Sequence, residues 1–115
     1  MLMKDIMTGT FETLSADDTI QKVARLFRKT RLEALPVTRD DNHLIGIMTK
    51  ANLYDAVARG MLPEMPIRDL FTTDVMTLNE NIPYEKVKEV VRASHAGNAI
   101  VVNDNEEVSG VFTKT

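Results

Sequence analysis

A regular spacing of apolar residues predicts a helix early in the chain. Four apolar side chains recur three or four positions apart, which places them on one helical face: Ile20, Val23, Ala24 and Phe27. The serine and aspartate side chains of residues 15–18 precede this stripe and can accept hydrogen bonds from the free amide groups of a first turn. We therefore expect a helix that starts within residues 15–18.

Two apolar stretches follow, and both are too short for a typical helix. Residues 35–37 and 44–48 are mostly apolar, and the polar residues 39–43 between them are typical of a hairpin turn. Residues 50–59 then suit a helix, and Gly60 occupies the position where helix ends favour glycine. This order predicts a unit of helix, strand, strand and helix.

The same pattern occurs twice. Shifting the chain by 64 positions aligns residues of many types without a gap, for example Gly46 with Gly110. Agreement across so many residue types indicates an internal duplication. We assign residues 1–62 to the first repeat and residues 63–115 to the second.

The second repeat carries its own signals for a helix and a hairpin. Asn81 can cap a helix, Pro83 suits its first turn, and the apolar stripe is Tyr84, Val87 and Val91. Strands are expected over 99–102 and 108–112, with a polar turn over 103–107. A unit of about 60 residues buries little core by itself. We therefore expect the repeats to pack sheet to sheet about a pseudo-twofold axis, giving an α/β (α+β) fold with a cleft between them.

Short motifs found in both repeats resemble the CBS-domain family. In the first repeat they are residues 5–8, 34–37 and 46–53, and in the second they are 74–77, 98–102 and 110–115. With these motifs in the same order twice, nearly the whole chain is similar to a tandem pair of such domains, a Bateman module. The resemblance implies a non-enzymatic regulatory module that requires no cofactor and binds AMP, ADP, ATP or S-adenosylmethionine in its cleft.

The resemblance also implies which residues line two ligand sites. The first site would use Thr13, Leu35, Pro36, Val37, Thr49, Ala51 and Asn52, and the second Thr77, Ala99, Ile100, Val101, Thr113 and Thr115. Chemically, an apolar strand edge with free backbone groups could bind flat adenine. The amide groups of the helix that follows Thr49 would favour a phosphate.

The chain departs from the family pattern at two places. The family's ribose-binding aspartate is Asn52 here, which offers a neutral acceptor in place of a charged one. The second repeat stops at Thr115, before the matching residue and its closing helix. We therefore expect an excised piece of a longer protein, with an output domain C-terminal to residue 115. By analogy we favour a transcription or signal-transduction regulator.

Composition narrows the functional classes further. An apolar fraction of 43% with 27% charged residues is ordinary for a soluble globular protein, and the net charge of −3 argues against a nucleic-acid binder. The chain has no cysteine, and no apolar run long enough to span a bilayer, so a cytoplasmic location is the default. His43 and His95 have no acidic residues at ligand spacing, so we expect no metal site.

Plainer interpretations remain for several of these residues. Thr49 and Thr113 suit helix N-caps without any ligand. A basic cluster is typical of a solvated helix face: Arg25, Arg28, Lys29 and Arg31. The alternative function is a structural dimerisation module with a vestigial pocket, which Asn52 supports. In either case we expect a homodimer, because the missing last helix would leave apolar surface exposed, and such surface tends to be buried against a partner.

Overall fold

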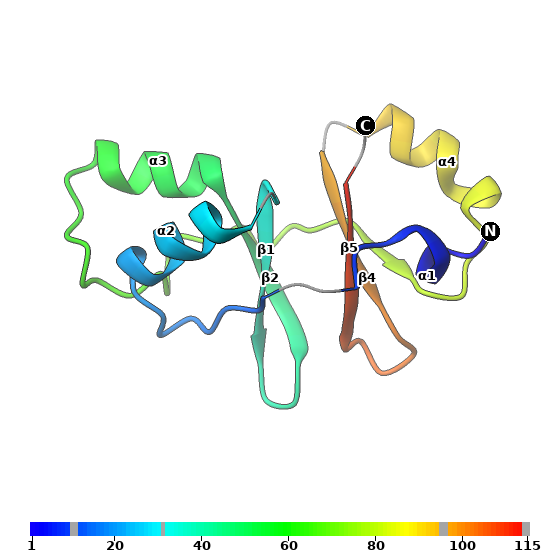
Figure 1. Cartoon of the computed structure of the whole chain (residues 1–115), viewed down its shortest axis with the longest axis horizontal. Helices are drawn as coiled ribbons and strands as arrows, with labels where there is room; N and C mark the ends of the chain where they lie inside the picture. The colour runs from blue at the N-terminus through cyan, green and yellow to red at the C-terminus, as the bar shows by residue number, and fades with distance from the viewer. Residues whose placement is uncertain (10–11, 31, 95–96, 114–115) are drawn as a thin grey trace.

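The computed structural model describes residues 1–9, 12–30, 32–94 and 97–113, and these ranges form two halves side by side (Figure 1). One half packs helices α2 (Ile20–Lys29) and α3 (Lys50–Ala58) on the antiparallel hairpin of β1 (Ala34–Arg39) and β2 (His43–Thr49). The other half packs α1 (Met3–Ile6) and α4 (Tyr84–Ala93) on a sheet ordered β3 (Thr77–Asn79), β4 (Asn98–Val102), β5 (Val108–Thr113). The predicted fold class is confirmed.

The two hairpins have the same register. Val37 lies opposite Gly46 in the first, and Val101 lies opposite Gly110 in the second. An irregularity follows Val37 in β1 and Val101 in β4, so even the bulge is duplicated. The pseudo-symmetry that the sequence predicted is therefore present at the level of individual strand pairs.

The helix starts differ from the predictions. Helix α2 is capped by Thr19, whose hydroxyl accepts a hydrogen bond from the Lys22 amide at 3.1 Å. The Ser15 amide instead donates to Asp18 Oδ2 at 2.9 Å, which closes a separate turn. The predicted helix start within residues 15–18 is wrong because these side chains cap their own turn.

Helix α4 begins at Tyr84, three residues after Asn81. Its N-cap is Pro83, and the Asn81 amide donates to Asn79 Oδ1 at 2.9 Å, so Asn81 belongs to the turn after β3. The predicted stripe faces inward as expected, with Val91 buried and Tyr84 and Val87 packed against the same core. Asn81 as the cap is therefore wrong, whereas the helix itself is confirmed.

An apolar layer joins the two sheets. It combines side chains of the first hairpin with side chains of the second: Ala34, Ile47, Ile100, Val102, Val108 and Val111. Each half also has its own core between sheet and helices. The repeats thus pack sheet to sheet, and the shared layer fixes the position of one repeat against the other.

The segments at the start of each repeat are exchanged between the halves. We call residues 2–8 and 66–72 the crossing segments. Met3 is fully buried in the core of the second repeat, and its counterpart Ile67 is fully buried in the core of the first. Figure 1 shows this for α1, which lies in the half that contains α4 and β5. The sequence pattern did not predict this exchange.

Two glycines make the exchange possible. A Cβ atom on Gly46 would lie 2.7 Å from the carbonyl oxygen of Thr72, and one on Gly110 would lie 2.8 Å from that of Thr8. Each crossing segment therefore runs directly over a strand that has no side chain at that point. Gly46 and Gly110 align across the duplication because both strands carry a crossing segment.

Candidate functional site: a cavity between the repeats

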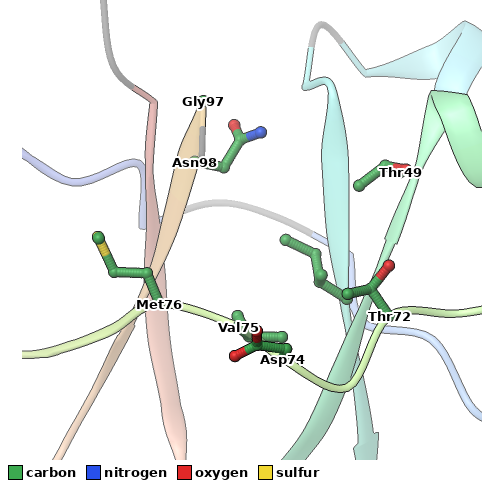
Figure 2. A pocket seen from close by; sticks show the side chains of 8 residues that line it. Thr49, Thr72, Asp74, Val75, Met76, Gly97 and Asn98 are labelled. Atoms are coloured by element: carbon green, nitrogen blue, oxygen red, sulfur yellow. The ribbon is translucent and has the colours of Figure 1, made fainter. Parts of the chain in front are cut away.

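A cavity opens between the repeats where β2 ends and β4 begins (Figure 2). Its volume is about 170 Å³, which is smaller than the roughly 300–1,000 Å³ of typical small-molecule sites, and it is partly open to solvent. Both repeats and the chain before β3 line it: Ile47, Thr49, Thr72, Asp74, Val75, Met76, Gly97 and Asn98. We call this the Thr49 cavity.

The second crossing segment forms one wall of the Thr49 cavity. The Thr72 amide donates to the Ile47 carbonyl at 2.9 Å, and the Ile47 amide donates to the Thr72 carbonyl at 2.8 Å. This bridge fixes residues 72–76 beside the end of β2. Because Gly46 lets the segment approach so closely, the glycine is a structural requirement of the cavity.

Thr49 and Asn52 lie at the start of α3 and are tied to each other. The Asn52 amide donates to Thr49 Oγ1 at 3.0 Å, and the Thr49 amide and hydroxyl both donate to Asn52 Oδ1 at 2.9 Å. The Thr72 hydroxyl also points at Asn52 Oδ1, at 3.4 Å. This reciprocal cap of α3 uses the carboxamide oxygen of Asn52 fully.

Asn98 lies on the opposite wall, at the start of β4. Figure 2 shows its carboxamide directed from β4 toward the side that carries Thr49. The hydroxyl of Thr113, its partner on β5, lies 3.3 Å from Asn98 Oδ1. Because that oxygen accepts a hydrogen bond from Thr113, the amide group of Asn98 is left to face the cavity.

The lining combines an apolar surface with hydrogen-bonding groups at its margin. Ile47, Val75 and Met76 can contact a flat apolar ring, while the hydroxyls and carboxamide around them can bind hydroxyl or ring nitrogen atoms. Asp74 adds a carboxylate. Such a lining suits a small heterocyclic ligand with a polar substituent.

The site residues predicted for the first repeat separate in the structure. Thr49 lines the cavity. Asn52 does not line it, but its Oδ1 accepts from the hydroxyls of two lining residues, Thr49 and Thr72. The side chains of Leu35 and Val37 lie in the core under α2 and α3, and Pro36 is also buried. Thr13 and Ala51 are exposed and lie outside the cavity lining.

The predicted residues of the second site are also dispersed. The side chains of Ala99 and Val101 lie in the core with Met3, and Ile100 lies in the layer between the sheets. Thr77 and Thr113 are exposed. Thr115 falls outside the described residues. The assignment of the predicted residues to ligand sites stays a prediction.

The strand edges are not free for adenine, which corrects one expectation. The Leu14 amide donates to the Pro36 carbonyl at 2.9 Å, and the Ile100 amide donates to the Met76 carbonyl at 3.0 Å. The edge of β4 is further covered by β3, which pairs with it in parallel. A ligand would therefore meet the ends of these strands, as at Gly97 and Asn98, because their central backbone groups are used.

Sequence reasoning missed most of the cavity because it grouped residues by repeat. Thr72, Asp74 and Asn98 belong to the second repeat, yet they face Thr49 of the first. The useful signal was the aligned pair Gly46 and Gly110, since a glycine within a strand indicates a close backbone approach. It marks where a crossing segment passes, and hence which residues join the site.

The rest of the described chain supplies no metal centre. Within the described ranges, no three His, Cys, Asp or Glu side chains gather as a metal ion would require. None of the helices of this part of the chain has the length and apolar character needed to cross a membrane.

Comparison with known proteins finds relatives of both repeats. The family model for the CBS domain matches residues 3–59 and 67–115. The chain is 30% identical over 114 residues to homoserine O-acetyltransferase of Methanosarcina acetivorans, which covers 98% of this chain and 20% of that protein. It thus spans about a fifth of the length of this curated relative.

Two solved structures have the same fold. The CBS domain pair of protein MJ0100, in complex with 5′-methylthioadenosine and S-adenosyl-L-methionine, has a TM-score of 0.84 and 26% identity, covering 98% of this chain and 89% of that one. The CBS domain protein PAE2072 from Pyrobaculum aerophilum, complexed with AMP, has a TM-score of 0.85 and 21% identity, covering 98% and 87%. At that identity the second likeness concerns the fold alone.

Proposed function

The chain belongs to the CBS-domain family, and from that premise we propose that it is a regulatory module that binds an adenosine-containing ligand in the Thr49 cavity. The observation that carries the proposal is the composition of the cavity wall. One wall comes from the first repeat, and the others come from the second repeat and its crossing segment. A ligand there would contact both repeats and so bias their relative position.

The related structures support the choice of ligand class. The domain pair of MJ0100 binds 5′-methylthioadenosine and S-adenosyl-L-methionine, and PAE2072 was solved with AMP. All three ligands share the adenosine moiety. The apolar surface of the Thr49 cavity offers contacts for the adenine ring that these ligands share, and its hydroxyl groups offer hydrogen bonds for the ribose.

We further propose that the ligand signal passes to a linked output domain. The curated relative with homoserine O-acetyltransferase activity in its name is about five times longer than the match. A module that makes up a fifth of a protein suits a regulatory role within it. An output domain after residue 115, of the transcription or signal-transduction kind, is the form of this proposal that analogy favours.

The test is binding of adenosine ligands to the chain and to a variant with a filled cavity. A Cβ atom on Gly97 would meet no atom within 4 Å, so Gly97→Leu fills the cavity without a clash near the backbone. Gly9 is also unobstructed but lies outside the cavity lining, so Gly9→Leu is the matched control. Isothermal calorimetry and thermal shift should detect binding by the natural chain and by Gly9→Leu.

The outcome separates the regulatory module from its alternative. Loss of binding in Gly97→Leu alone supports the Thr49 cavity as the site. Equal loss in both variants, or equal binding by both, would contradict it. If no adenosine ligand binds the natural chain, the dimerisation module with a vestigial pocket becomes the better account.

We also propose that the chain forms a homodimer through the groove between α2 and α3. Tyr54 and Val57 of α3 are 65% and 63% exposed beside this apolar groove, which also includes Ala24 and Pro63. A second copy related by a twofold axis would bring the same apolar groove against itself. This surface belongs to the first repeat, whereas the sequence had suggested the second.

Sedimentation analysis of two matched variants tests this interface. Val57→Glu places a charge in the proposed interface and should shift the dimer to monomer. Val90 of α4 is similarly exposed at 61% but lies on the second repeat, so Val90→Glu should leave the dimer intact. The reverse result would move the interface to α4, and a natural chain that stays monomeric at high micromolar concentration would refute the dimer.

A further inference from the structure

The charge of the Thr49 cavity points to the kind of adenosine ligand. Among the eight residues that line it, Asp74 is the one with a formal charge. Asp74 is exposed and forms no ion pair with another described residue. The lining therefore presents one negative charge that no described cation neutralises. A phosphate group would gain no positive partner there.

The cation nearest to the site in sequence faces another surface. Lys50 follows Thr49 directly, but its side chain lines a depression on the α2 side with Phe27 and Arg28. Its ammonium group also lies 3.6 Å from Glu33 Oε1. Lys50 is therefore directed away from the cavity and paired, so it is not placed to bind an anion in it.

The start of α3 is also poorly prepared for a phosphate. Helix N-termini bind anions through free amide groups. The Lys50 amide already donates to the Glu33 carbonyl at 3.1 Å, and the Asn52 amide donates to Thr49 Oγ1 at 3.0 Å. Two of the first three amide groups are thus used within the protein. This helix start offers little to a phosphate tail.

From these three observations we infer that the Thr49 cavity selects adenosine ligands whose 5′ substituent is neutral or cationic over those with a phosphate tail. The inference rests on the proposed function and specifies its ligand class. A sulfonium or ammonium group would be attracted by Asp74, whereas a dianionic phosphate would be repelled by it. The cost of repulsion grows with the charge of the tail, so ATP should bind more weakly than AMP.

The test compares four ligands that differ in tail charge. Calorimetry at one fixed pH measures the binding of S-adenosylmethionine, 5′-methylthioadenosine, AMP and ATP. We expect S-adenosylmethionine to bind about tenfold or more tightly than AMP at low salt. Asp74→Asn should reduce that ratio several-fold, and 5′-methylthioadenosine, which is uncharged, should change least.

A matched control separates a local charge from net charge. Asp41→Asn removes the same charge at a hairpin tip, where its positive φ of 49° suits asparagine. This control should leave the ligand ratios unchanged. An equal effect of both variants would overturn the inference, as would tighter binding of AMP or ATP than of 5′-methylthioadenosine by the natural chain. Binding of none of the four ligands would defeat the proposed function as well.

Discussion

The Thr49 cavity and its pseudo-symmetric counterpart around Thr113 share one backbone frame but differ in their side chains. The shift of 64 positions relates Ile47 to Val111 and Thr72 to Thr8, and both bridges between strand and crossing segment are present. The Thr8 amide donates to the Val111 carbonyl at 2.8 Å, much as Thr72 does to Ile47. The duplication therefore keeps the backbone of both sites.

The side chains on the opposite wall differ between the two sites. Gly97 and Asn98 of the Thr49 cavity correspond to Glu33 and Ala34 around Thr113. Glu33 is bulkier than glycine and carries a charge, and the methyl group of Ala34 is buried in the layer between the sheets. The comparison shows that the frame comes from glycines and strand register, whereas ligand capacity depends on a few side chains at strand ends.

The largest loss of stability is expected from adding a side chain between a strand and the crossing segment that runs over it. Gly46→Ala would force the Phe71 ring and the Thr72 carbonyl away from β2. Gly110→Ala meets the flexible end of Met7 and the Thr8 carbonyl, so its neighbours can yield more easily. Overpacking costs typically about 1–3 kcal/mol. We expect Gly46→Ala near the upper end and Gly110→Ala lower, measured by urea unfolding.

Ligand binding is a second measurement that compares the two glycine variants. Gly46→Ala should also weaken ligand binding, because Thr72 and Asp74 follow the displaced segment, while Gly110→Ala should bind normally. A loss of binding in Gly110→Ala equal to that in Gly46→Ala would show that the two halves are not independent. Circular dichroism of each variant at room temperature is the control, because it shows whether a loss of ligand binding is due to unfolding.

The next effect concerns the number of sites. The shift of 64 positions places the counterpart of Asn52 at position 116 and the counterpart of α3 at positions 114–122. We expect a chain extended by one helix, about a dozen residues, to bind a second ligand near Thr113, raising the stoichiometry from one to two. An unchanged stoichiometry would indicate that Glu33 and Ala34 close the second site whatever follows Thr115.

The sequence predicted the long helices and the hairpin strands of both repeats because their signals are local, whereas the short elements α1 and β3 were not predicted. The stripe that begins at Ile20, the hairpin turns and Gly60 each depend on neighbouring residues, and the duplication supplied a second reading of the same pattern. Helix caps were less accurate, since Thr19 and the side chains of residues 15–18 offer the same chemistry. Local patterns cannot distinguish which of two adjacent oxygens caps the helix.

The site was harder to predict because its residues meet across the duplication. Thr49 was identified within a motif, but no local pattern indicates that a crossing segment passes over the opposite repeat. Leu35, Ala99 and Val101 have their side chains in the cores, so their predicted part in a ligand site would rest on their backbone. The alternation of side chains along a strand indicates which face of the strand is turned inward. It does not indicate whether core side chains or a ligand cover that face.

The smallest effect is expected from Asn52→Asp. In the natural chain Asn52 Oδ1 accepts from the Thr49 amide and hydroxyl and lies 3.4 Å from the Thr72 hydroxyl, so no acceptor remains for a ribose. Aspartate would keep one oxygen in the cap and free the other, with a charge. A hydrogen bond to a charged group exceeds a neutral one by about 1 kcal/mol, which predicts several-fold tighter binding.

5′-Methylthioadenosine is the suitable ligand for the Asn52→Asp measurement, because it has a ribose but no phosphate that a new carboxylate would repel. Calorimetry should give a several-fold lower Kd for Asn52→Asp than for the natural chain. The melting temperature without ligand serves as a second readout, since a carboxylate in the first turn of α3 should raise it slightly through the helix dipole. A higher melting temperature with an unchanged Kd would mean that residue 52 only caps α3 and that the ribose is bound elsewhere in the cavity.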